Sequence, residues 1–137
     1  MANRTKILFL LRSYNDIDHI VPIIWKALGY GLKCYYIFVD NDFSDDYRIN
    51  FVRSRGARQI TTSFLIDYHQ ITRKRIPFYF LRRIVDRVVA LGVGTKILLT
   101  YKIDSVVNEW SGPYGREMAE YFLRSATLLR IPRFCVP

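Results

Sequence analysis

The sequence predicts a Rossmann-like α/β domain, in which a doubly wound parallel sheet lies between two helical layers in a three-layer α/β/α arrangement. Two observations lead to this fold class. Short apolar runs alternate along the chain with segments of helical length, as expected for parallel strands joined by right-handed helical crossovers. The 137 residues are 50% hydrophobic, which is enough for one core but leaves no room for a second domain. We therefore expect residues 1–137 to form a single domain.

The first elements are expected to be a strand, a helix and a second strand. Residues 6–11 (KILFLL) form an uninterrupted apolar run, typical of a strand that is buried on both faces. Asp16 or Asp18 is expected to cap the following helix, which would place Pro22 in the first turn, where a missing N–H costs least. Residues 34–39 (CYYIFV) are rich in strand-forming residues and predict the second strand.

The next helix is expected to begin near Ser44, Asp45 and Asp46, whose side chains suit an N-cap and the positive end of a helix dipole. It should end at Gly56. An alternating, β-branched stretch at residues 58–65 predicts a third strand.

A basic insertion, residues 66–96, precedes the second half of the fold and is expected to contain a helix that starts near Phe80. Apolar residues that recur with helical spacing predict a stripe facing the core, with Arg82, Arg83, Asp86 and Arg87 turned away. The members of this stripe are Leu81, Ile84, Val85, Val88 and Leu91. Residues 92–101 suit either a continuation of that helix or a short strand.

The last elements are expected to be a strand, a helix and a final strand. The fourth strand should begin at Ser105 and end at Glu109. Ser111, Gly112 and Pro113 then predict a helix start with proline at its first position. Residues 131–136 (IPRFCV) predict the last strand, and we expect that the loop after it is missing from this chain.

Several classes of site are excluded by the sequence. It contains neither a Gly-x-Gly-x-x-Gly turn nor a phosphate-binding loop motif, so an NAD enzyme or a P-loop NTPase is not expected. His19 and His69 have no metal-ligand spacing, and Cys34 and Cys135 lie in apolar runs, where we expect buried thiols and no disulfide. We therefore expect no metal and no cofactor.

The chain is expected to be cytoplasmic. Its longest weakly charged stretch is too short and too interrupted to span a bilayer, and no signal-peptide cleavage site follows the N-terminal apolar run.

Two loops are expected to meet at the carboxyl edge of the sheet, because they follow strands that should be neighbours. Residues 12–19 hold carboxylates and a histidine beside a helix N-terminus, which suits the orientation of a hydroxyl and the removal of its proton. Capping would explain one of Asp16 and Asp18, but not both together with Arg12 and His19.

The second loop, residues 109–117, places Gly112 and Gly115 at a helix start. Glycines allow close approach of a ligand to the backbone, and the free N–H groups of a helix start favour an anion. The alternative is that Gly112 and Pro113 only turn the chain.

The sequence Gly-Pro-Tyr-Gly-Arg-Glu at 112–117, preceded by a strand ending in Glu109 and followed by the strand IPRFCVP, resembles the N-terminal half of GT-B-fold transferases of bacterial surface polysaccharide synthesis. The nearest group is the CDP-glycerol glycerophosphotransferase-like group, with a looser likeness to nucleotide-sugar 2-epimerases. The resemblance extends over most of the chain. It is strongest at residues 6–26 and 104–137 and weakest in the basic insertion.

The resemblance implies a two-domain enzyme in which this half engages a lipid-linked glycan or polyol-phosphate acceptor and a missing half binds the nucleotide-activated donor. Asp16 or His19 would be the general base or would orient it. The implied catalytic residues are Asp16, His19 and Glu109. The implied substrate-binding residues are Arg12, Ser13, Tyr14, Asn15, Gly112, Tyr114, Gly115 and Arg116. Alone, the chain is expected to be inactive, and the exposed cleft face of a half-enzyme would favour self-association.

The charge points to a second expectation. Residues 48–96 contain 11 bases and two acids, which accounts for the whole net charge of +9. An anionic partner fits this segment, and we expect residues 73–91 to attach the domain to the inner face of the plasma membrane. The proposed membrane-facing bases are Arg73, Lys74, Arg75, Arg82, Arg83 and Arg87. The alternatives are that this segment is an ordinary solvated surface, or that the chain is a non-enzymatic module that binds membranes or proteins. Nucleic acid is not expected as a partner, because no RNP, KH or helix-turn-helix signature is present.

Overall fold

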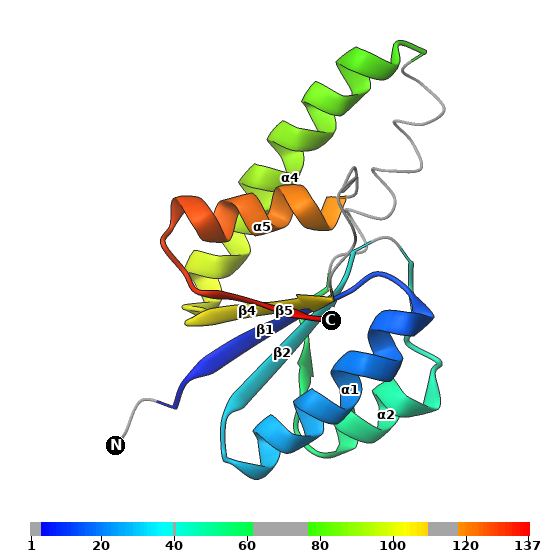
Figure 1. The fold of residues 1–137 in the computed structure, drawn as a ribbon, viewed down its shortest axis with the longest axis vertical. Coiled ribbons are helices and arrows are strands. Elements are labelled where there is room, and N and C mark those ends of the chain that lie inside the picture. The colour runs from blue at the N-terminus through cyan, green and yellow to red at the C-terminus, as the bar shows by residue number, and fades with distance from the viewer. Residues whose placement is uncertain (1–3, 40, 62–76, 110–117) are drawn as a thin grey trace.

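The computed structural model describes residues 4–39, 41–61, 77–109 and 118–137. The described strands form one parallel sheet in the order β3-β2-β1-β4-β5 (Figure 1). They are β1 (Lys6–Leu11), β2 (Lys33–Phe38), β3 (Arg58–Gln59), β4 (Ser105–Glu109) and β5 (Arg133–Val136). The Rossmann-like fold is therefore confirmed, and β1 and β4 are neighbours at the point where the strand order reverses, as expected.

Helices cover both faces of this sheet (Figure 1). They are α1 (Tyr14–Gly29), α2 (Tyr47–Ser54), α4 (Tyr79–Tyr101) and α5 (Met118–Leu128). Along β1 successive side chains point to opposite faces. Phe9 and Leu11 pack in the core beneath α1 and α2, whereas Leu8 and Leu10 pack in the core beneath α4 and α5.

The start of α1 differs from the prediction. Ser13 is the N-cap, and its hydroxyl accepts a hydrogen bond from the backbone N–H of Asp16. Asp16 therefore lies inside the first turn, and Pro22 lies in the helix interior rather than in the first turn. The predicted caps were wrong because the carboxylate of Asp16 turns inward to Arg12.

The orientation of α4 is the larger correction. Its buried positions are Asp86, Ala90, Gly94, Ile97 and Leu98. Three members of the predicted core stripe are instead exposed: Leu81 (51%), Ile84 (43%) and Val88 (62%). The reason is visible in Figure 1, where the N-terminal half of α4 projects beyond α5 and away from the sheet. Residues 92–101 continue this helix.

Three smaller differences from the prediction concern the cap of α2, the third strand and the cysteines. The cap of α2 is Asp46, while Ser44 bonds to Asp42. Of the predicted third strand, Arg58–Gln59 pairs with β2, and residues 62–65 lie outside the described residues. Both cysteines are free; Cys34 is buried as expected, but Cys135 is exposed because β5 lies at the edge of the sheet.

Candidate functional site

The candidate site lies at the carboxyl ends of β1 and β4. The order β3-β2-β1-β4-β5 means that the chain moves outward in one direction after β1 and in the other direction after β4. The loops that follow these two strands diverge, and the crevice between them is the usual ligand position in doubly wound sheets. Residues 12–19 and Glu109 stand at this place.

Asp16 forms the buried centre of the site. Its side chain has no exposed area. It accepts hydrogen bonds from the backbone N–H of Arg12 at 2.8 Å, from Arg12 Nε at 2.9 Å and from Arg12 Nη2 at 3.1 Å. Ser13 Oγ donates to the same carboxylate at 3.0 Å. A carboxylate held by this many donors is fixed in position, and its burial keeps it out of reach of a ligand.

His19 and Glu109 form the accessible part of the site. His19 Nδ1 lies 2.7 Å from Glu109 Oε1, and Arg12 Nη2 lies 3.9 Å from Glu109 Oε2. The His19 side chain is half exposed, at 51%, whereas that of Glu109 is 13% exposed. With Glu109 ionised, Nδ1–H donates to the carboxylate, which holds the ring in one orientation and leaves Nε2 as its acceptor nitrogen.

The two carboxyl groups of the site titrate in opposite directions. The neighbouring Asp16 carboxylate and burial raise the pKa of Glu109 above its ordinary value of 4.5, and His19 only partly offsets this. Burial alone would raise the pKa of Asp16, but hydrogen bonds with Glu109 and Arg12 outweigh it and lower the pKa below 3.8. Two carboxyl groups in contact do not ionise equally easily, and Arg12 decides that Asp16 ionises first.

The structure thus brings together Arg12, Asp16, His19 and Glu109, as the sequence predicts for their location. Tyr14 is exposed at the rim, and its ring packs edge-on against the buried Phe43 at 5.0 Å between centroids. The remaining predicted substrate-binding residues divide into those with a local structural role and those that cannot be placed. Ser13 is the helix cap, Asn15 is exposed, and Gly112, Tyr114, Gly115 and Arg116 lie outside the described residues.

Sequence reasoning missed the contribution of the loop after β2. Asn41 Nδ2 donates to the carbonyl oxygen of Arg12 at 3.2 Å and so ties this loop to the site. Arg48, at the start of α2, pairs with Asp46 at 2.7 Å and also with Asp18. The rule that identified residues 12–19, that carboxyl ends of parallel strands share one edge, would have identified Asn41 as well.

The proposed membrane-facing segment is described only from residue 77 onward, so Arg73, Lys74 and Arg75 lie outside the described residues. Phe78 (73% exposed), Tyr79 and Phe80 (75% exposed) all face solvent at the start of α4. The guanidinium groups of Arg82 and Arg83 lie 5.4 and 5.7 Å from the centre of the Tyr79 ring. Arg87 is exposed one turn further along.

Neither a metal site nor a membrane span is found in the part of the chain that the structure describes. No three His, Cys, Asp or Glu side chains are grouped there so as to hold a metal ion. Similarly, none of the described helices combines the length and apolarity needed to cross a bilayer.

Comparison with known proteins supports the fold. No family model matches the chain, and no curated protein matches its sequence. Among solved structures, the C-terminal domain of a hydrogenase from Pyrococcus furiosus is similar with a TM-score of 0.56 and 14% identity, covering 96% of this chain and 89% of that one. A second structure of that hydrogenase's C-terminal domain gives a TM-score of 0.51 at 13% identity, covering 96% and 91%.

A glycosyltransferase from Rickettsia africae is also similar, with a TM-score of 0.50 and 12% identity over 96% of this chain. The chain spans only 29% of the length of that protein. At these identities the similarities show the shared Rossmann-like α/β fold and nothing about activity.

Proposed function

We propose that this domain is the acceptor-binding half of a glycosyl- or glycerophosphotransferase of cell-surface polysaccharide or teichoic-acid-like synthesis. The observation that carries the proposal is the pair formed by His19 and Glu109, 2.7 Å apart at the strand-order reversal. A half-exposed imidazole oriented by a carboxylate is suited to accept a proton from a bound hydroxyl. The weak structural similarity to a glycosyltransferase agrees with this assignment.

The proposed reaction needs one proton acceptor in this domain. The acceptor hydroxyl oxygen forms a bond to the anomeric carbon or the phosphorus of the donor, and the bond from that atom to the nucleotide's leaving oxygen breaks. The hydroxyl proton passes to Nε2 of His19, whose Nδ1–H is held by Glu109, and a nucleoside phosphate departs. The imidazolium that forms is stabilised by the adjacent Glu109 carboxylate.

Asp16 and Arg12 act as positioning residues in this proposal. Asp16 has no exposed surface, so it does not receive the proton, although its carboxylate fixes the Arg12 guanidinium. Arg12 in turn lies beside Glu109, with Nη2 3.9 Å from Oε2. Replacing Arg12 should therefore loosen the hold of Glu109 on the His19 ring, although Arg12 itself does not contact the acceptor in this proposal.

The finer assignment, to the CDP-glycerol glycerophosphotransferase-like group, rests on the sequence resemblance. In such an enzyme the nucleotide-activated donor is held by a second domain, and residues 112–116 would contact an anionic part of the acceptor or donor. We therefore expect no turnover by the 137-residue domain alone. Nucleotide release from CDP-glycerol or common UDP-sugars above that of a boiled control would contradict this expectation.

Acceptor binding tests the site itself. We would follow the backbone amide signals of residues 12–19 by NMR while adding glycerol 3-phosphate or a short lipid-linked glycan analogue. Saturable shifts that disappear in His19→Ala and weaken in Glu109→Gln, but persist in the surface control Lys26→Gln, would support the proposal. Acceptors that bind equally well to His19→Ala would overturn it.

A second candidate role is attachment to an anionic membrane surface through α4, and the exposure of Phe78, Phe80 and Leu81 favours it. A stripe packed on the sheet would leave nothing apolar to insert, whereas these side chains are available. The bases beside them fit anionic headgroups at about 1 kcal/mol each, while a second copy of the helix would bring like charges together.

The position of α4 also suits a lipid-linked acceptor. The helix ends at Tyr101 and β4 begins at Ser105, so the C-terminus of α4 lies at the amino end of the strand. Its exposed N-terminal half therefore lies on the side of the carboxyl ends of the strands, although it projects away from the sheet (Figure 1).

Co-sedimentation with vesicles tests this role. Binding to anionic but not neutral vesicles should be lost in Phe80→Ser with Leu81→Ser, and reduced when Arg82, Arg83 and Arg87 become glutamine. Adding Arg73, Lys74 and Arg75 to the glutamine set tests the preceding basic segment. Trp25→Ser, an exposed aromatic on α1, is the matched control. Equal binding to both vesicle types, or dimerisation through α4 in sedimentation, would contradict membrane attachment.

A further inference from the structure

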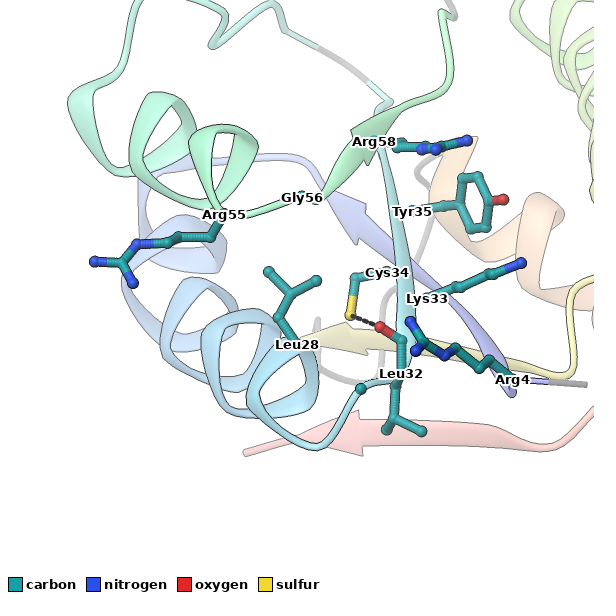
Figure 2. Close-up of a pocket in the computed structure, with 10 residues that line it drawn as sticks. Arg4, Leu28, Leu32, Lys33, Cys34, Tyr35, Arg55, Gly56 and Arg58 are labelled. Carbon is teal, nitrogen blue, oxygen red and sulfur yellow. Dashed lines mark hydrogen bonds between the residues drawn. The ribbon is translucent and has the colours of Figure 1, made fainter. Parts of the chain in front are cut away.

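A cavity of about 290 Å³ opens at the end of the sheet opposite to the candidate site (Figure 2). Its walls are the short segments that follow α1 and α2, together with the first residues of β2 and β3. Among the residues that the structure describes, all charged residues that line it are basic, and none is a carboxylate. These bases are Arg4, Lys33, Arg55 and Arg58.

The side chains of Arg4, Lys33 and Arg58 form no ion pair or hydrogen bond with the residues that the structure describes. Arg55 stacks on the Phe51 ring at 5.3 Å. In contrast, Arg12 and Arg48 at the other end of the sheet are paired with carboxylates. Like charges placed together without a counter-charge repel one another, and a bound anion relieves that repulsion.

Two neighbouring features could reduce the positive potential of the cavity, but neither cancels it. Burial raises the pKa of the Cys34 thiol to about 11, so this group stays neutral at physiological pH. The C-termini of α1 and α2 each carry roughly half a negative charge. Together they offset only about one of the positive charges on the cavity's bases, so the cavity remains attractive to an anion.

The bases divide into two groups in Figure 2. Lys33 and Arg58 extend to the same side of β2 as the Tyr35 ring, and Arg4 reaches toward Lys33 from the chain before β1. Arg55 lies on the opposite side and points away from them. The backbone beside the cavity is also open, because a Cβ added at Gly31 or Gly56 would meet nothing within 4 Å.

We propose that Arg4, Lys33 and Arg58 bind a small, multiply charged phosphate ligand of the diphosphate class. Guanidinium and ammonium groups are the donors that recognise phosphate oxygens most strongly, and arginine can do so through two parallel hydrogen bonds. The cavity is at the small end of ligand sites, which fits a diphosphate group better than a whole nucleotide. This site is independent of the proposed transferase site, since the two lie at opposite ends of the strands.

Calorimetric titration of the 137-residue domain with inorganic diphosphate tests the proposal. We expect saturable binding that weakens about tenfold in Lys33→Gln and in Arg58→Gln, because each removes a charge-assisted hydrogen bond. The matched control is Lys96→Gln, an exposed base on α4 that carries the same charge change and should leave the Kd within about twofold. Circular dichroism of each variant confirms that it is folded.

Several outcomes would overturn the inference. Diphosphate that does not bind saturably, or that binds Lys96→Gln as weakly as Lys33→Gln, would show a diffuse effect of net charge. A single-stranded oligonucleotide that binds more tightly than diphosphate and depends on the same bases would indicate a nucleic-acid surface instead. The His19→Ala variant should bind diphosphate normally, so a failure of the transferase proposal is distinguishable from a failure here.

Discussion

The contact between α4 and α5 makes a sharp prediction at Gly94. This residue is buried where the two helices meet, whereas Gly92, one half-turn away on α4, faces open space. A methyl group built on Gly94 would lie 2.7 Å from Ser125 Oγ, 3.2 Å from Ser125 Cβ and 3.3 Å from Phe122 Cδ2. A methyl group built on Gly92 would meet nothing within 4 Å. The same substitution should therefore have opposite effects at these two positions.

The magnitude follows from three contributions. Replacing a helical glycine with alanine stabilises a helix by roughly 1 kcal/mol, and this applies at both positions. At Gly94 overpacking costs about 1–3 kcal/mol. Ser125 Oγ is fully buried and donates to the carbonyl oxygen of Leu91 at 3.0 Å, so moving it away adds the loss of a hydrogen bond, about 1 kcal/mol. Gly94→Ala should lower the free energy of unfolding by about 1–3 kcal/mol, and Gly92→Ala should raise it by up to about 1 kcal/mol.

Urea unfolding followed by circular dichroism measures both changes, and thermal unfolding should show Tm shifts of about 3–4 °C per kcal/mol for a chain of this size. The second variant, Gly94→Ala with Ser125→Ala, removes the oxygen at 2.7 Å and should recover much of the loss. Equal stability of Gly94→Ala and Gly92→Ala would refute the packing argument. A double variant no better than Gly94→Ala would show that Phe122 or the backbone, and not Ser125, resists the methyl group.

Three further predictions concern the site and its surroundings. Because the pKa of Asp16 is lowered below 3.8, its ionised form stabilises the fold above that pH. Asp16→Asn should therefore lower the free energy of unfolding by about 3 kcal/mol at pH 7. In urea titrations, this difference from wild type should vanish as the pH falls through the lowered pKa. The pKa of Glu109 is raised above 4.5, so the stability that its protonated form contributes is present below that value and is lost as the pH rises through the folded pKa. Glutamine does not titrate, so between pH 4.5 and 7 the Tm of Glu109→Gln should fall less than the Tm of wild type. Acceptor binding should weaken in the same variant. Asp46→Ala should lower stability by about 1 kcal/mol through loss of the α2 cap, whereas Ser44→Ala should have a smaller effect, and equal effects would mean that the cap is shared.

The sheet was predictable because its strands are encoded locally. Residues 6–11 have no polar interruption, and a run of this kind in a chain of alternating strands and helices fits a central parallel strand. The adjacency of β1 and β4, and with it the meeting of residues 12–19 with Glu109, then follows from the reversal of strand order. The location of the candidate site could therefore be predicted from the sequence, whereas the contacts within it could not.

The burial of α4 was not predictable, because its sequence supports two orientations. The spacing of Leu81, Ile84 and Val88 is that of a core stripe, and only the tertiary packing reveals that this face is uncovered. At the buried face, α4 approaches α5 closely at Gly94, where the absence of a side chain permits contact with Ser125. A single glycine in a helix carries little signal in a sequence, so this contact was not predictable.

Which residue of the site is suited to which role also depends on tertiary structure. In sequence, Asp16 and His19 are equal candidates for a general base, since both lie in the same loop and helix start. The structure separates them, because Asp16 is sealed beneath Arg12 and its pKa is lowered, while His19 is half exposed and bound to a Glu109 whose pKa is raised. When the environments of two interacting acids differ in this way, the one that ionises first serves as the fixed charge and the other can respond to a neighbour. In the proposed transferase site, Asp16 would thus be the fixed charge, and Glu109, through His19, would be the group whose charge a bound hydroxyl senses.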